Sequence, residues 1–280
     1  MRKSGVVADA RGLGVHDHVC WQYDDPADFR LRAREFLLDG LALGQRSVYL
    51  ASGEVPALVE DLHGSPDLAR ALDDGSAEVA SLDAVHPHGA VVDPAAQVRH
   101  YAQATGEALA AGFTGLRVAA DCTSLVLTDD QLDAFARYEH LIDRYMATRP
   151  FSALCAYDSG RLDGRRIAHL ACLHPNTNAE LAGFRLHASG PEGTALGGEV
   201  DALTDELFTS ALVHADLRPH EGRLVLDADE LTFLDHNGLL RLAEHADDRD
   251  ATLVLRTSWP GVARLAGALD LPNVHVERAA

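Results

Sequence analysis

The sequence predicts an α/β protein with a mainly parallel sheet covered by helices on both faces, followed by a smaller α/β domain. Through the first 175 residues, short apolar segments alternate with amphipathic segments of helical length. A turn-rich stretch follows at residues 174–178, and the alternation then restarts on a smaller scale. We therefore expect a domain at residues 1–175, a linker at 176–183 and a second domain at 184–280.

In the first domain, strands and helices alternate along the chain, as βαβ units require. Strands are expected at residues 16–23, 47–51, 77–82, 116–120 and 151–157. Helices are expected at residues 29–41, 55–72 with a break near 64–66, 93–111, 132–145 and 165–173. Within the fourth helix we interpret Tyr138 and Glu139 as a packing residue and a surface residue.

The C-terminal residues repeat this alternation with shorter elements. Strands are expected at residues 184–188, 224–226, 253–255 and 274–276. Helices are expected at residues 200–214, 238–246 and 260–269. About a hundred residues of this kind form an independent α/β unit.

Charge and composition exclude several classes of protein. The net charge is −19 and the chain has no Lys/Arg-rich run, so we expect no direct nucleic-acid binding and no binding to anionic membranes. Lys3 is the only lysine, and the glycine-rich loop that must precede the essential lysine of a phosphate-binding loop has no room before it. A phosphate-binding loop of this kind is therefore excluded. No apolar run is long enough to span a membrane, and the N-terminal residues lead into mixed polar sequence, so we expect a cytoplasmic protein.

Four separated cysteines form no Cys-x-x-Cys pair, so we expect buried reduced thiols and no disulfide framework. One of them belongs to the most chemically suggestive cluster, His16, His18 and Cys20. In a strand, residues two apart share a face, so these three side chains can point the same way. A metal site completed by a distant ligand, a small-molecule contact and structural packing all remain open; no other cofactor is expected.

The carboxyl ends of the predicted strands form the second candidate site. Parallel sheets bind ligands at this edge, where polar and aromatic residues converge. Together with His16, His18 and Cys20, the candidate ligand-binding residues are Trp21, Tyr23, Glu54, Asp121, Tyr157 and Asp158.

The C-terminal part resembles the STAS domain of anti-sigma-factor antagonists. The resembling segments, in the same order and spacing, are residues 196–201, 224–227, 233–239, 253–256 and 261–265. The resemblance implies docking of an anti-sigma factor or another kinase-fold regulator. Five consecutive residues at a helix start would form the docking site: Asp235, His236, Asn237, Gly238 and Leu239. Where the family carries a phosphorylated serine or threonine this chain has His236, which removes the usual phosphorylation switch.

The first domain resembles the MEDS domain, a sensory module of bacterial regulators. The resemblance lies in residues 16–23, 36–44, 112–118, 138–139, 154–158 and 174–175. That family looks like a relative of RecA-type ATPase domains that has lost its phosphate loop, so the resemblance implies a RecA-like sheet. Asp121 occupies the place of the acidic residue that ends a core strand in RecA-like domains.

Together these features predict a sensor in which the first domain recognises a small molecule or a state and the second docks a protein partner, affecting transcription indirectly. No catalytic motif is recognisable, so we expect no enzymatic activity. The alternatives are a metal- or nucleotide-dependent enzyme on a degenerate RecA-like domain, and a scaffold. Homo-oligomerisation stays open.

Overall fold

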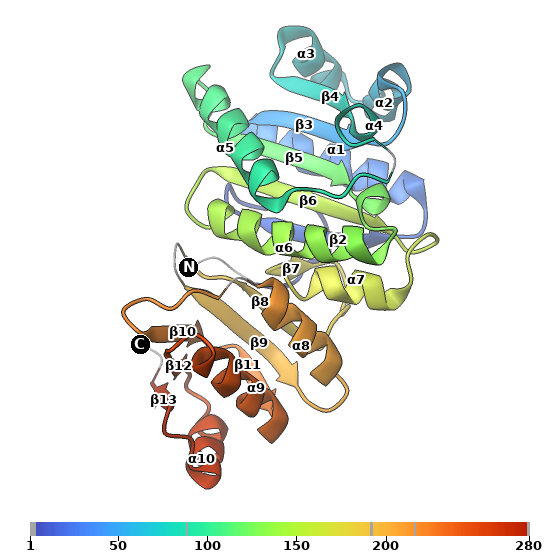
Figure 1. Cartoon of the computed structure of the whole chain (residues 1–280). Helices are drawn as coiled ribbons and strands as arrows, with labels where there is room; N and C mark the ends of the chain where they lie inside the picture. Colours follow the sequence, from blue (N-terminus) through green and yellow to red (C-terminus); the bar gives the residue numbers. More distant parts are fainter. Residues whose placement is uncertain (1–3, 88, 191–192, 216, 279–280) are drawn as a thin grey trace.

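The computed structural model describes residues 4–87, 89–190, 193–215 and 217–278. Its larger sheet contains seven parallel strands in the order β1-β7-β2-β6-β5-β3-β4 (Figure 1). The strands are β1 (Gly5–Val6), β2 (His18–Tyr23), β3 (Arg46–Ala51), β4 (Ala77–Ser81), β5 (Leu116–Asp121), β6 (Phe151–Asp158) and β7 (Asn176–Thr177). The expected parallel α/β architecture is confirmed.

Helices cover both faces of this sheet. One face packs against α1 (Pro26–Ala42), α2 (Val55–Leu62) and α3 (Pro66–Asp74). The other packs against α5 (Pro94–Ala110), α6 (Asp129–Met146) and α7 (Gly164–Ala171), with the short α4 (Leu82–Val85) and η1 (Thr123–Leu125) at strand ends. The longest helix, α6, begins with a reciprocal cap between Thr128 and Gln131, which fixes where it starts.

The C-terminal part forms a second, mixed sheet of six strands. A hairpin of β8 (Phe184–Ala188) and β9 (Thr194–Val200) is antiparallel, and the remaining pairs are parallel. The other strands are β10 (Arg223–Asp227), β11 (Leu231–Leu234), β12 (Thr252–Arg256) and β13 (Val274–Glu277). The helices are α8 (Asp205–His214), α9 (His236–Asp247) and α10 (Pro260–Leu269).

Several segments differ from the sequence prediction, which did not include strands β1 and β9. Val200, expected to open a helix, ends strand β9, and α8 begins only at Asp205. Strand β11 was not predicted, because two of its four side chains are exposed and the apolar signal is weak. Asn176 and Thr177, expected to open the linker, form strand β7 between β1 and β2.

The two parts share one apolar core. Buried side chains of α6 and α7 lie in the same cluster as Phe184 and Leu186 of β8 and Phe208 of α8. In Figure 1, β8 and α8 lie directly below α6 and α7. An apolar interface of this kind favours rigid attachment over free domain motion.

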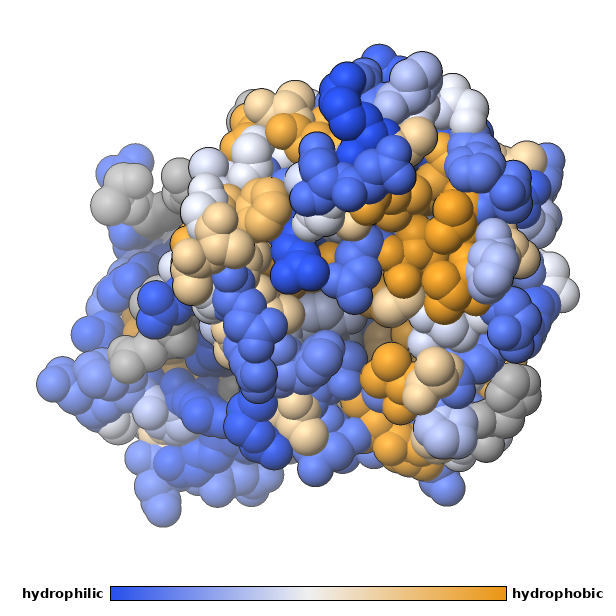
Figure 2. Space-filling model, turned by 90° about the horizontal axis from the view of Figure 1, so that it is seen from above, coloured by the Kyte–Doolittle hydropathy of each residue, from blue (hydrophilic) through white to orange (hydrophobic). Residues whose placement is uncertain are grey.

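At the opposite end of the molecule, the face of β3, β4 and β5 beside α5 is incompletely covered. A groove of about 400 Å³ there is lined mainly by apolar side chains, including Val48, Ala80 and Tyr101. Figure 2 views this end and shows apolar patches among hydrophilic side chains. Among the described residues, none of the helices has both the length and the apolar character of a transmembrane segment.

Candidate functional site

Four ionisable side chains meet in the interior between the large sheet and the helices α6 and α7. They are His18 from β2, Glu139 from α6, Cys155 from β6 and His174, three residues after α7. His18, Glu139 and His174 are fully buried and Cys155 is 5% exposed, and one donor atom from each lies within 4.8 Å of the other three. We call these four residues the buried cluster.

The contacts inside the buried cluster centre on Glu139. Its Oε2 atom lies 3.1 Å from His18 Nε2 and 3.7 Å from His174 Nε2. The Cys155 Sγ atom lies 3.5 Å from His18 Nε2 and 3.9 Å from Glu139 Oε2. The two imidazole rings are adjacent, with centroids 4.0 Å apart.

Neighbouring groups hold three of these side chains in place. His18 Nδ1 donates to Asp143 Oδ1 at 3.0 Å, and His174 Nδ1 donates to the carbonyl oxygen of Leu170 at 2.8 Å. The hydroxyl of Tyr157 donates to Glu139 Oε1 at 2.6 Å. His18, Glu139 and His174 therefore each use one side-chain polar atom for these supporting bonds. The second polar atom of each side chain points at the centre of the buried cluster.

Burial and these hydrogen bonds shift the pKa values of the cluster in different directions. Burial lowers the pKa of His18, but hydrogen bonds to Asp143 and Glu139 outweigh it and leave that pKa above 6.5. Burial raises the pKa of Glu139, but the two histidines bring it below its ordinary value. Burial, with the neighbouring His18, lowers the pKa of His174 to about 4.

Asp143 connects the buried cluster to the C-terminal part of the chain. Its Oδ1 atom accepts from His18, and its Oδ2 atom accepts from the backbone N–H of Ala188 at 2.8 Å. Ala188 is the last residue of β8, and Asp143 is fully buried. A carboxylate on α6 thus joins the packing against the large sheet to the second sheet.

The predicted ligand-binding residues do not form one site, because they point to both faces of the sheet. Along β2, His18 and Cys20 face α6 and α7, whereas Trp21 and Tyr23 face α1. The Trp21 indole donates to Asp28 and lies under the guanidinium of Arg32. His18 and Trp21 therefore belong to opposite faces of the sheet.

The proposed metal trio is also not brought together. His16 precedes β2, and its Nδ1 donates to the carbonyl oxygens of Met146 and Arg149. His18 instead meets Glu139, Cys155 and His174, and Cys20 is not one of the four. Tyr157 is the other predicted residue at this cluster, through its bond to Glu139.

Three predicted residues do converge at the carboxyl edge of the sheet. The Tyr23 hydroxyl donates to Asp121 Oδ2 at 3.0 Å, and Asp158 contributes to the raised pKa of Tyr23, whose main cause is burial. Glu54 is exposed at the start of α2 and makes no capping bond. The edge therefore carries the predicted tyrosine–carboxylate group without Glu54.

A cavity of about 330 Å³ lies near the ends of β3 and β5, and its lining does not include Tyr23, Asp121 or Asp158. Its polar lining includes Ser52, Asp83, Ser124, Gln131 and Arg161. Ser52 donates to Ser124 at 3.1 Å, and Asp83 accepts from the backbone of Gly53 at 2.8 Å. His86 also lines the cavity, and its buried Nε2 atom has no hydrogen-bond partner among the described residues.

The sequence interpretation of Glu139 as a surface residue is wrong. A charged residue in mid-helix was expected at the surface, but Glu139 is fully buried and Tyr138 is only 6% exposed. Its partners come from positions 18, 155, 157 and 174, far apart in the chain. The only available signal was that Glu139, Cys155 and His174 all fall in segments that resemble the MEDS domain.

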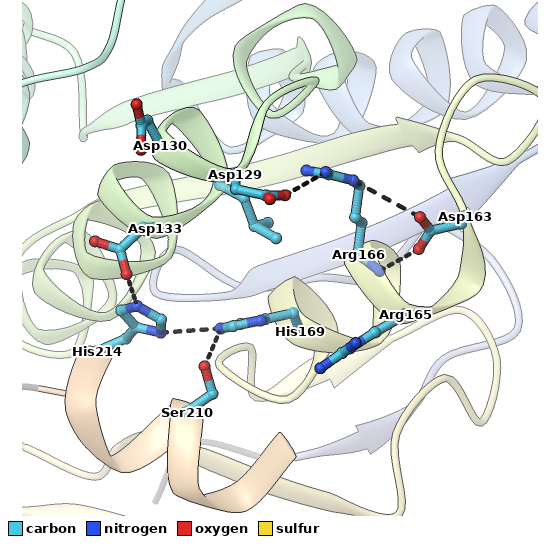
Figure 3. A pocket seen from close by; sticks show the side chains of 10 residues that line it. Asp129, Asp130, Asp133, Asp163, Arg165, Arg166, His169, Ser210 and His214 are labelled. Carbon is cyan, nitrogen blue, oxygen red and sulfur yellow. Dashed lines mark hydrogen bonds and ion pairs between the residues drawn. The ribbon is translucent and has the colours of Figure 1, made fainter. Parts of the chain in front are cut away.

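A second polar site lies between α6, α7 and α8, in a pocket of about 560 Å³ (Figure 3). There His214 contacts Asp133 through Nε2 and His169 Nε2 through Nδ1, at 2.9 Å for the latter pair. Ser210 Oγ lies 3.3 Å from the same His169 nitrogen. With both rings neutral, His214 donates to Asp133 through Nε2 and accepts the proton of His169 Nε2 through Nδ1. His169 Nε2 then has no lone pair with which to activate Ser210. These residues therefore do not form a catalytic triad.

The predicted docking residues divide into exposed and buried members. His236 and Asn237 are exposed, and Asp235 caps α9 by accepting from the N–H of Gly238 at 2.8 Å. Gly238 and Leu239 are buried. A Cβ on Gly238 would lie 2.7 Å from side chains of β9 and β11, so this glycine serves internal packing. The docking role predicted for Gly238 and Leu239 is not compatible with their burial.

The fold and the site together describe a parallel α/β domain with a buried polar cluster, joined to a smaller α/β unit. The family model of the MEDS domain, the methanogen/methylotroph DcmR sensory domain, matches residues 17–175. This match spans more than half of the chain, and the chain belongs to that family. Membership indicates a sensing role in signal transduction.

No curated protein matches the chain. The family match ends at residue 175, and the STAS resemblance of the C-terminal part stays a prediction.

Proposed function

We propose that the protein is a sensor–effector in which helix α6 couples ligand recognition by the MEDS domain to partner docking by the C-terminal unit. The carrying observation is that three functional features lie along this one helix. Gln131, in its first turn, lines the 330 Å³ cavity; Glu139 belongs to the buried cluster; and Asp143 bonds Ala188 of β8. From Gln131 to Asp143 the helix rises roughly 18 Å, at about 1.5 Å per residue.

The cavity at the carboxyl edge suits a small molecule that combines apolar and polar groups, because Leu125 and Leu127 line it beside its polar side chains. Its lining offers hydroxyl groups, a carboxylate and the guanidinium of Arg161, which are the convergent polar groups of a small-ligand site. The unpartnered Nε2 atom of His86 supplies one further hydrogen-bonding position. A ligand held there contacts the N-terminal turn of α6 and so acts on the coupling helix directly.

The docking surface that we propose on the C-terminal unit consists of Leu203, Phe233, His236 and Asn237. Leu203 is 94% exposed and Phe233 is 43% exposed, although both are large apolar side chains. Both side chains flank the start of α9. Phe233 lies on β11, which directly precedes this helix. Leu203 follows Val200 in the chain, and the Val200 carbonyl accepts from the backbone N–H of Asp235, the capping residue of α9. Following the STAS resemblance, the partner is an anti-sigma factor or a related kinase-fold regulator.

Ligand recognition is tested by a thermal-shift screen of small metabolites on the full chain. We expect saturable stabilisation by one chemical class, lost in Arg161→Ala and kept in Arg99→Ala, because exposed Arg99 does not line the cavity. Stabilisation that survives Arg161→Ala would place the ligand elsewhere.

Docking is tested by calorimetric titration of kinase-fold anti-sigma factors from the same genome. Leu203→Asp should weaken binding by at least about tenfold, since a central apolar contact is worth more than ~1.4 kcal/mol. Val91→Asp, at an exposed apolar position far from α9 in the chain, serves as the matched control. Equal affinity in both variants would remove this surface from the proposal.

A further inference from the structure

We propose that the buried cluster is a metal site, in which His18, Glu139, Cys155 and His174 together bind one divalent cation of the zinc class. Two imidazoles, one thiolate and one carboxylate form a donor set that suits Zn²⁺. The four come from β2, α6, β6 and the segment after α7, so the cation would tie together elements across the whole domain.

The spacing of the donor atoms fits tetrahedral coordination. Metal–ligand bonds of about 2.0–2.3 Å place the ligand atoms of a tetrahedron roughly 3.3–3.8 Å apart. The separations of His18 Nε2 and of His174 Nε2 from Glu139 Oε2 are 3.1 and 3.7 Å, and those of Cys155 Sγ from His18 and Glu139 are 3.5 and 3.9 Å. These four separations lie within about 0.2 Å of the tetrahedral range, and the remaining two are below 4.8 Å.

The supporting hydrogen bonds are those of a metal site. Metal-binding histidines commonly donate their other ring N–H to a carboxylate or a backbone carbonyl. Here His18 donates to Asp143, and His174 donates to Leu170 O. Glu139 is held by Tyr157 through Oε1, which leaves Oε2 for the ion.

His174 carries the strongest evidence for a cation. A carbonyl oxygen can only accept, so the bond to Leu170 places the ring proton on Nδ1 and leaves a lone pair on Nε2. That Nε2 atom is buried, has no hydrogen-bond partner among the described residues, and faces a carboxylate oxygen 3.7 Å away. Two acceptors facing each other in the interior need a proton or a cation between them.

A hydrogen-bonded network without metal accounts for only half of the cluster. A protonated His18 between Glu139 and Asp143 satisfies that ring and both carboxylates. It leaves His174 Nε2 unexplained, because a neutral His174 still directs its lone pair at Glu139. With four protein ligands and no exposed member, the metal site would be closed, which is typical of a structural ion and not of a catalytic one.

Elemental analysis and cobalt substitution of the full chain test this site directly. We expect about one zinc per chain after purification, and Co²⁺ added to chelator-treated protein should give a thiolate charge-transfer band with the intense visible bands of tetrahedral cobalt. Cys155→Ala should abolish the charge-transfer band, and His174→Ala should weaken zinc binding by at least about 100-fold. Cys172→Ala is the matched control, since its buried thiol bonds the His169 carbonyl and is not among the four ligands.

The wild-type spectra decide the question even where a variant does not fold. The site would be overturned if folded wild-type protein holds no zinc, gives no cobalt spectrum and shows no rise in melting temperature with Zn²⁺. Bound metal without a thiolate band, or zinc binding that Cys155→Ala and His174→Ala leave intact, would overturn it too. Neither readout involves α9 or the cavity, so the result is independent of the signalling proposal.

Discussion

Replacing Asp143 with asparagine tests the link between the sheets, because it keeps the shape of the side chain and removes one acceptor. Asp143 is fully buried and accepts from His18 through Oδ1 and from Ala188 through Oδ2. Whichever way the amide lies, its NH₂ group faces one of these two N–H donors. A hydrogen bond to a charged acceptor contributes about 1.5–3 kcal/mol, and an unsatisfied buried donor costs about 1–3 kcal/mol.

We therefore expect Asp143→Asn to lower the free energy of unfolding by about 2–4 kcal/mol, a large share of the ~5–15 kcal/mol of an ordinary domain. Urea denaturation followed by circular dichroism measures this as a lower midpoint. Asp130→Asn is the control on the same helix, where the side chain is exposed, and should change stability by less than about 0.5 kcal/mol. Equal midpoints for both variants would refute the bridging role of Asp143.

Three further predictions address other parts of the chain. Gly198→Ala should lower the free energy of unfolding, measured by urea denaturation, by at least about 2 kcal/mol. The reason is that φ of Gly198 is +87° and a Cβ would lie 2.4 Å from a backbone carbonyl oxygen. The control Gly164→Ala, whose Cβ would have no atom within 4 Å, should be nearly neutral. Burial, with a neighbouring histidine, lowers the pKa of His169 to about 4, so the unfolded chain takes up a proton between pH 6.5 and 4 that the folded chain does not. Stability should fall as pH falls through that window, and His169→Gln should flatten the fall in denaturation curves; an unchanged slope would contradict it. The double variant His236→Ala/Asn237→Ala should keep the wild-type melting temperature in calorimetry while losing partner binding, since both side chains are exposed.

The sheet could be predicted from the sequence because its strands are apolar and short. Residues 151–157 are all buried, and such runs between helix-length segments indicate central strands of a parallel sheet. Strand β11 carries no such signal, since Thr232 and Phe233 both face solvent. Its pairing with β9 is set by tertiary contact, which a local pattern does not contain.

The buried cluster could be predicted only in part. His18 stood out because it belongs to a compact group of histidines and a cysteine, and the spacing of two along a strand correctly predicted that it shares a face with Cys20. Glu139 did not stand out, because a lone carboxylate in an amphipathic helix usually faces water. Its burial depends on partners from β2, β6 and the segment after α7, and sequence periodicity does not show such convergence.

We propose that a change at the large sheet reaches the second sheet through α6, and hydrogen exchange with mass spectrometry tests this coupling most directly. His18→Gln removes the ring nitrogen that bonds Asp143, and Tyr49→Phe is a control in the same domain that loses one hydrogen bond, to Asp61. We expect faster exchange in peptides covering residues 184–200 for His18→Gln and wild-type exchange there for Tyr49→Phe. Altered exchange confined to residues before 175 in His18→Gln would contradict the coupling.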